Sequence, residues 1–257
     1  METGISLVTT AVLFVAGILG GATAALAGGA SFFTFPALIL SGLSPLVANA
    51  TNFVALIPAN IAALPAYRNE LRAIGRAMIA PIVAGSLGGL TGALLLVYMG
   101  AAAFKGAVPW LIGFATLLFW LAPHLRALIV RRRGEGAGGG AVGLLGLFLL
   151  SIYGGYFGAG LGQIMLGALI LMGESDFHRA NALKNAVIGA LSLIACVIYV
   201  AGGSVDWPAA LIVMAGAALG GYLGGAMARK VPLALLRGAV IGIGVILTVV
   251  AFVKAGG

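Results

Sequence analysis

Charged residues are scarce in this chain of 257 residues. Only 8% of the residues are Asp, Glu, Lys or Arg and 62% are hydrophobic, whereas a soluble domain usually carries about 25% charged residues. No residue between Glu2 and Arg68 is acidic or basic, although a membrane-crossing helix needs only about 20 apolar residues. A water-soluble fold is therefore excluded, and the sequence predicts an all-α polytopic membrane protein.

Several chemical signatures are also missing. The single cysteine, Cys196, lies in an apolar run, so the chain has neither a disulfide framework nor a cysteine-based metal motif. The sequence contains no HExxH, GxSxG or Walker A motif and no paired carboxylates inside an apolar run. The two histidines, His124 and His178, are expected at the membrane interface. The sequence thus predicts that the protein is not an enzyme and binds no cofactor or metal.

The net charge of +8 is distributed in short basic clusters between the apolar runs. This placement is typical of membrane topology signals rather than of a nucleic-acid-binding surface. The lipid bilayer is the expected environment, and no nucleic-acid partner is expected. The N-terminus begins with an acidic residue and lacks the basic region of a cleaved signal peptide, so the first apolar run is expected to be retained.

Apolar runs divide the chain into eight long hydrophobic helices and two short, discontinuous ones. The short pieces, Ser31 to Ser41 and Leu161 to Met172, are too short to cross a ~30 Å hydrocarbon core as straight helices. The stretch 131–140 reads RRRGEGAGGG and predicts a basic, glycine-rich linker. It separates an N-terminal half, 1–130, from a C-terminal half, 141–257. The long helices are predicted near residues 5–27, 45–67, 76–99, 106–125, 141–158, 177–201, 207–228 and 233–253.

The two halves resemble each other. In the first half, the glycine-flanked segment 28–42 precedes the sequence ANATN at 48–52, and in the second half segment 159–173 precedes ANALKN at 180–185. Each half therefore contains a glycine cluster, a short apolar piece, another glycine and an Ala-Asn-Ala motif, in the same order. This pattern predicts an internal repeat.

Basic residues favour an inverted repeat. If each short piece carries the chain across the membrane, each half makes five crossings and the halves have opposite orientations. Eleven basic residues then face the cytoplasm, and only Lys105 and Lys254 lie outside, as the positive-inside rule prefers. In a parallel repeat, in which each short piece enters the membrane and returns to the same side, eight basic residues lie inside and five lie outside. The eleven are Arg68, Arg72, Arg76, Arg126, Arg131, Arg132, Arg133, Arg179, Arg229, Lys230 and Arg237.

Glycines surround the starts of the two short helices. Because a helix start offers free N–H donors and the positive end of the helix dipole, two such starts at the bilayer midplane suit an oxyanion. The alternative is that these glycines only allow close helix packing. The candidate substrate-binding glycines are Gly28 and Gly29 in the first half and Gly158, Gly160 and Gly162 in the second.

Polar side chains follow each short helix. Asn181, Lys184 and Asn185 share one helix face, and Asn49 and Asn52 form the corresponding pair in the first half. Polar groups are costly in lipid, so these side chains are expected to face the protein interior and to contact the substrate. For the lysine, the alternative is that it reaches back to the cytoplasmic interface. A further candidate is Gln163, just inside the second short helix, as an orienting donor.

These motifs resemble the TauE/SafE family of sulfite exporters and related organosulfur-anion transporters. The strongest match is GGYFGAGLGQIMLGALILMG at 154–173 followed by RANALKN at 179–185. In the first half, the family often has three glycines where this chain has Gly28, Gly29 and Ala30. The resemblance implies that the protein moves sulfite, sulfoacetate or a related sulfonate across the cytoplasmic (inner) membrane of a prokaryote as a multi-pass protein.

Two functions remain open at this point. The first is a secondary transporter that binds a small anionic substrate between the two glycine-rich breaks. The second is a membrane channel or a non-transporting interaction subunit, in which the breaks line a pore or contact a partner.

Overall fold

The computed structural model describes residues 6–26, 28–62, 64–133, 140–174, 176–227 and 233–256, and every regular element in these ranges is a helix. The all-α prediction is therefore confirmed for this part of the chain. The 3₁₀ turns Leu64–Tyr67 and Gly75–Met78 flank the short helix α4. The α-helices are α1 (Leu7–Leu26), α2 (Ser31–Leu40), α3 (Pro45–Ala62), α4 (Arg68–Ile74), α5 (Ile79–Arg133), α6 (Gly140–Tyr156), α7 (Leu161–Leu171), α8 (Phe177–Ala201), α9 (Trp207–Met227) and α10 (Leu233–Gly256).

The short helices α2 and α7 coincide closely with the two short apolar pieces. Helix α5 is a continuous element of 55 residues, but Gly100 has non-helical dihedral angles, with φ 74° and ψ −179°. This break separates two segments that correspond to the predicted helices 76–99 and 106–125. The helix predicted at 45–67 ends early, at Ala62, and the 3₁₀ turn that follows it contains Pro65, which has no backbone N–H to continue the α-helix.

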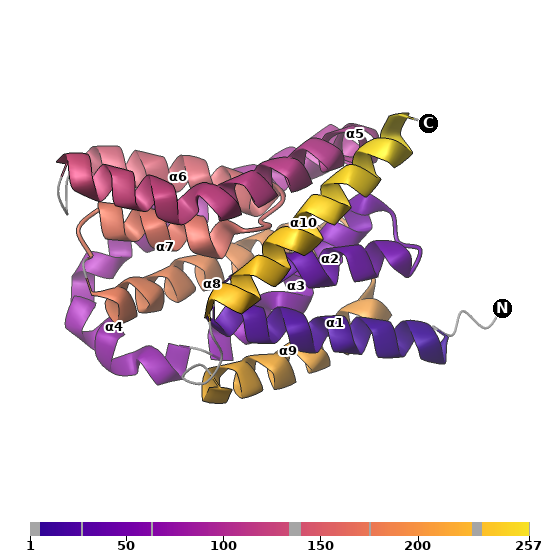
Figure 1. The fold of residues 1–257 in the computed structure, drawn as a ribbon, viewed down its shortest axis with the longest axis horizontal. Coiled ribbons are helices and arrows are strands. Elements are labelled where there is room, and N and C mark those ends of the chain that lie inside the picture. Colours follow the sequence, from indigo (N-terminus) through magenta and orange to yellow (C-terminus); the bar gives the residue numbers. More distant parts are fainter. Residues whose placement is uncertain are drawn as a thin grey trace.

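Helices α1, α2, α6 and α7 run roughly along one common direction, and α10 crosses them obliquely (Figure 1). The chain reverses direction between α1 and α2 and again between α6 and α7, so each short helix runs back alongside the long helix before it. Helix α4 lies at one end of the molecule, and α10 ends at the opposite one. Three described segments are long and apolar enough to cross a membrane alone, namely Leu7–Ala24, Arg68–Leu121 and Phe177–Ala201, and six further apolar helices are shorter.

Glycines bring helix backbones into direct contact at two interfaces, one between α1 and α9 and one between α5 and α6. A methyl group on Gly92 of α5 would lie 2.1 Å from the carbonyl oxygen of Ile152, and one on Gly220 of α9 would lie 2.0 Å from that of Ile18. No side chain fits at such distances, and small residues of this kind let membrane helices approach closely. We call these two interfaces the glycine seams.

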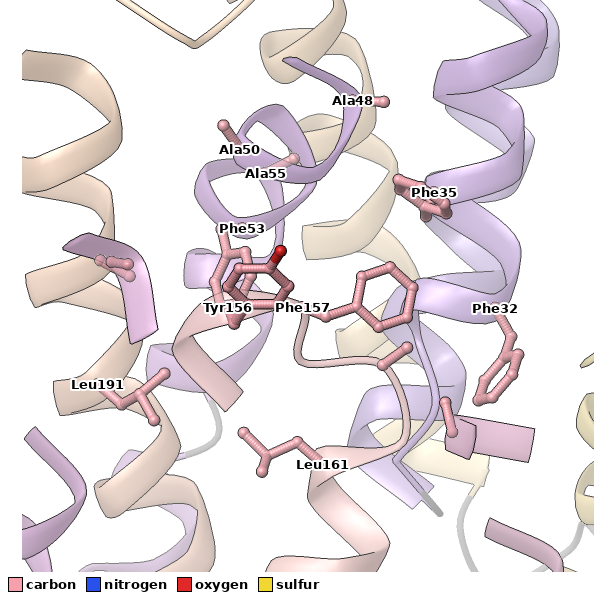
Figure 2. Packing of buried hydrophobic residues seen from close by; sticks show 14 of the residues in the cluster. Phe32, Phe35, Ala48, Ala50, Phe53, Ala55, Tyr156, Phe157, Leu161 and Leu191 are labelled. Carbon is pink, nitrogen blue, oxygen red and sulfur yellow. The ribbon is translucent and has the colours of Figure 1, made fainter. Parts of the chain in front are cut away.

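Aromatic residues pack around the connection between α6 and α7 (Figure 2). The ring of Phe157 meets that of Phe35 edge-on, with centroids 5.4 Å apart, and Tyr156 packs in the same way on Phe104 at 5.5 Å. Phe157 and Phe104 are almost fully buried. This packing helps to hold the non-helical segment between the two helices in place.

Candidate substrate site

The two glycine breaks meet at one cavity. Its volume is about 70 Å³, enough for several water molecules or a small anion. A methyl group on Gly28 would lie 3.2 Å from the Cα of Gly162, so the backbones of the two breaks are in contact. Gly28, Gly29, Gly158 and Gly160 all have φ between 71° and 97°, a region that residues with a Cβ rarely adopt. All five glycines singled out in the sequence line this cavity.

The cavity also receives the N-terminal ends of α2 and α7. Among the described residues, the N–H groups of Ala30, Ser31 and Gly162 have no hydrogen-bond acceptor, and all three residues line the cavity. The first N–H groups of a helix have no acceptor within the helix and carry its positive partial charge. Two helix starts therefore present donors to the same small space.

Lys184 of α8 is the ionisable residue of the cavity lining. Its side chain is only 5% exposed, and no hydrogen bond or ion pair joins it to any residue that the structure describes. The structure therefore places this lysine in the interior, and the interfacial alternative does not describe its position. A buried cation beside helix starts makes the cavity electrostatically favourable for an anion.

Asn52 of α3 lines the cavity and is held by two hydrogen bonds. Its amide nitrogen donates to Ser31 Oγ at 3.0 Å, and its carbonyl oxygen accepts from the hydroxyl of Thr34. Because Ser31 Oγ accepts the bond from Asn52, the hydroxyl proton of Ser31 remains available for another acceptor. This arrangement fixes the amide of Asn52 and leaves a hydroxyl donor at the start of α2.

The other predicted site residues do not line the cavity. Asn49 donates to the carbonyl oxygen of Tyr156 at 3.0 Å, and Asn181 donates to the hydroxyl of Tyr67 at 2.7 Å. Asn185 is buried in α8. Gln163 lies next to the cavity, where its backbone nitrogen would be 3.2 Å from a methyl group on Gly28.

The connection between α6 and α7 is braced from several sides. The hydroxyl of Tyr153 donates to the carbonyl oxygen of Ala159 at 2.6 Å, and that of Tyr199 donates to the carbonyl oxygen of Gly155. Asn49, from the first half of the sequence, holds the carbonyl of Tyr156. The bonds to Gly155 and Tyr156 satisfy carbonyl groups that the end of α6 leaves without helical partners, and the bond to Ala159 holds the connection itself. The position of the start of α7 is thus fixed by side chains from both halves.

Three polar residues of the cavity lining were missed in the sequence, namely Ser31, Asn60 and Ser192. Asn60 lies eight residues after Asn52, and Ser192 lies eight residues after Lys184. Positions i, i+4 and i+8 lie along one stripe of a helix. Extending this stripe by about two helical turns from Asn52 and from Lys184 therefore identifies Asn60 and Ser192.

Known proteins resemble this chain over most of its length. Residues 13–251 match the family described as Sulfite exporter TauE/SafE. A "Probable membrane transporter protein" of Haemophilus influenzae is 30% identical over 92% of this chain and 91% of the relative. "Probable membrane transporter protein YfcA" of Escherichia coli is 27% identical over 83% of this chain and 78% of the relative. No solved structure matches the chain.

The family match covers more than half of the chain, and the relatives are aligned over most of their own length. The apolar helices identify a membrane protein, in agreement with the relatives. The protein is a membrane transporter and belongs to the TauE/SafE sulfite exporter family.

Proposed function

We propose that this protein is a secondary transporter of a small sulfur-containing anion, namely sulfite, sulfoacetate or a related sulfonate. The observation that carries the proposal is the cavity at which the two glycine breaks, one from each half, meet a buried lysine. The family description names sulfite export, and the chemistry of the cavity fits a compact oxyanion.

Both backbone and side-chain groups bind the anion. The N–H groups of Ala30, Ser31 and Gly162 donate to its oxygens, as helix starts do for phosphate and sulfate. The ammonium group of Lys184 neutralises its charge, and the hydroxyl of Ser31 supplies a further donor. Each group lines the cavity and lacks a competing acidic partner there.

We propose further that the halves 1–130 and 141–257 are inverted repeats. The contacts at the two glycine seams support the repeat, because they correspond pair by pair, and the placement of the basic residues favours the inversion. A methyl group on Gly88 would lie 2.3 Å from the carbonyl oxygen of Phe148, and one on Gly216 would lie 2.3 Å from that of Phe14. Corresponding contacts on both sides of a molecule are what a pseudo-two-fold axis between repeats produces. Residues 134–139 of the linker lie outside the described residues.

The proposed location is the cytoplasmic membrane of a prokaryote, with the α4 end of the molecule in the cytoplasm. Arg68 and Arg72 lie in α4, and Arg179 lies in the first turn of α8, which packs against α4. Basic residues accumulate on the cytoplasmic side. Two further predicted cytoplasmic residues, Arg229 and Lys230, lie outside the described residues.

A flux screen tests the function. Purified protein is reconstituted into liposomes, and uptake of sulfite, thiosulfate, sulfoacetate and taurine is measured against their concentration. A transporter shows saturable uptake of at least one of these anions, and the Lys184→Ala variant loses most of it. The Lys105→Ala variant is the matched control, because Lys105 is exposed and far from the cavity lining in sequence.

Conductance that rises linearly with anion concentration would instead indicate a channel. Protein that reconstitutes well but moves none of the four anions would contradict the proposed substrate class. Equal uptake by the parent and Lys184→Ala would remove the lysine from the site.

A further inference from the structure

Among the residues that the structure describes, no carboxylate pairs with Lys184. The chain contains six acidic residues, and none lies within α8 or within any helix that lines the cavity. Glu70 belongs to the short connecting helix α4, and Asp206 precedes α9, where it caps the helix. The others are Glu2, Glu135, Glu174 and Asp176, at the N-terminus, in the linker and before α8.

The described side chains of the elements packed on α8 add no charge to the cavity. Helices α3 and α7 contain no ionisable residue. From α6, the hydroxyls of Tyr153 and Tyr156 donate to Ala159 and Met99. The remaining ionisable side chains that the structure describes on these elements and on α8 itself do not line the cavity: Tyr67, Arg68, Glu70, Arg72, Tyr98, Lys105, His124, His178, Arg179, Cys196 and Tyr199. The side chains of Arg126, Arg131, Arg132 and Arg133 lie outside the described part of α5.

An isolated ammonium group is costly in such surroundings because it loses its hydration without gaining an opposite charge, whereas a neutral amine is not. A bound anion removes this cost because it supplies the missing opposite charge. Binding of the anion and binding of a proton at Lys184 Nζ therefore favour each other, and by linkage each raises the affinity for the other by the same factor.

We infer that Lys184 takes up one proton from water when the anion enters the cavity and gives it back when the anion leaves. The amine lone pair forms the N–H bond on loading, and this bond breaks on unloading, so each anion is carried together with one proton. A monovalent anion then crosses without adding net charge to the carrier. This inference rests on the proposed function, since it requires an anion in this cavity.

The test uses the purified full-length protein and anions whose own charge is constant between about pH 7 and 9: methanesulfonate, thiosulfate and sulfoacetate. Kd is measured across this range, and proton uptake on binding is followed with an indicator dye in weakly buffered solution. We expect Kd to rise with pH, by up to about tenfold per unit, and one proton to be taken up per anion bound. A Kd that does not change with pH, together with no proton uptake, would overturn the inference.

Variants separate this inference from the proposed function. Lys184→Arg keeps its proton at every accessible pH, so it should bind the anion without pH dependence and without proton uptake. Lys184→Met should bind weakly at every pH, and Lys105→Met should behave as the parent does. If Lys184→Met binds as tightly as the parent, the proposed site is wrong. If Lys184→Met loses anion binding but the parent takes up no proton, only the inferred coupling between anion binding and proton uptake is wrong.

Discussion

Gly160 is the residue that starts α7, and its backbone lies in the left-handed region with φ at +73°. A residue with a Cβ is disfavoured there by roughly 1–2 kcal/mol, and a β-branched residue is a pronounced outlier. We predict that Gly160→Val shifts the start of α7 and reduces anion flux at least about tenfold, while the protein still inserts into the membrane. The measurements are uptake in proteoliposomes and the amount of protein in the membrane fraction.

The control at this position is Gly167→Val. Gly167 lies within α7 at a place where an added methyl group meets nothing within 4 Å. This variant should retain flux. Normal flux from Gly160→Val would mean that the glycine cluster serves packing alone.

The sequence identified five lining glycines, Asn52 and Lys184 because glycine clusters and lone polar residues stand out in apolar segments. It could not separate Lys184 from Asn181 and Asn185, because positions i, i+3 and i+4 all belong to one broad face. Only tertiary packing determines which part of that face meets the cavity. Asn181 instead reaches Tyr67, a residue 114 positions earlier in the chain, and such a contact has no local signal.

Helices α1 and α9 form one glycine seam, in which Gly220 faces a backbone carbonyl. A methyl group at Gly220 would lie 2.0 Å from the oxygen of Ile18, so Gly220→Ala must push the two helices apart. We predict a clearly lower melting temperature in detergent for this variant, since forced overpacking typically costs about 1–3 kcal/mol. Thermal unfolding followed by circular dichroism measures the effect.

Gly242→Ala in α10 is the matched variant, because a methyl group there meets nothing within 4 Å. It should melt at the parent temperature or above it, as alanine favours helix by up to about 1 kcal/mol over glycine. Equal melting temperatures for Gly220→Ala and Gly242→Ala would show that α1 and α9 can move apart at this glycine seam without loss of stability.

The lengths of the apolar runs predicted the positions of the long helices well and the residues at which they end less well. The break in α5 lies at Gly100, between the two separate helices predicted at 76–99 and 106–125. The helix α4 was not predicted. Its seven residues, Arg68–Ile74, are too few for a hydrophobic period to be recognised, and its position depends on its packing against α8.

The orientation of the whole molecule yields a labelling prediction. In a background with Cys196 replaced by serine, single cysteines at Arg72 and at His178 should both react with a membrane-impermeant maleimide from the cytoplasmic side. A cysteine at Lys105 should react from the opposite side. All three positions are exposed. If Arg72 and His178 are labelled from opposite sides, the inverted arrangement is wrong.

The backbone N–H donors at the N-terminal ends of α2 and α7 have a consequence for how such a protein evolves. A main-chain N–H is present whatever side chain the codon specifies, provided that the residue is not proline. Most substitutions in the surrounding helices therefore leave the proposed oxyanion donors intact as descendants of a gene diverge. On the proposed function, we expect changes of substrate to be concentrated in the few polar side chains that line the cavity, such as Ser31, Asn52 and Lys184.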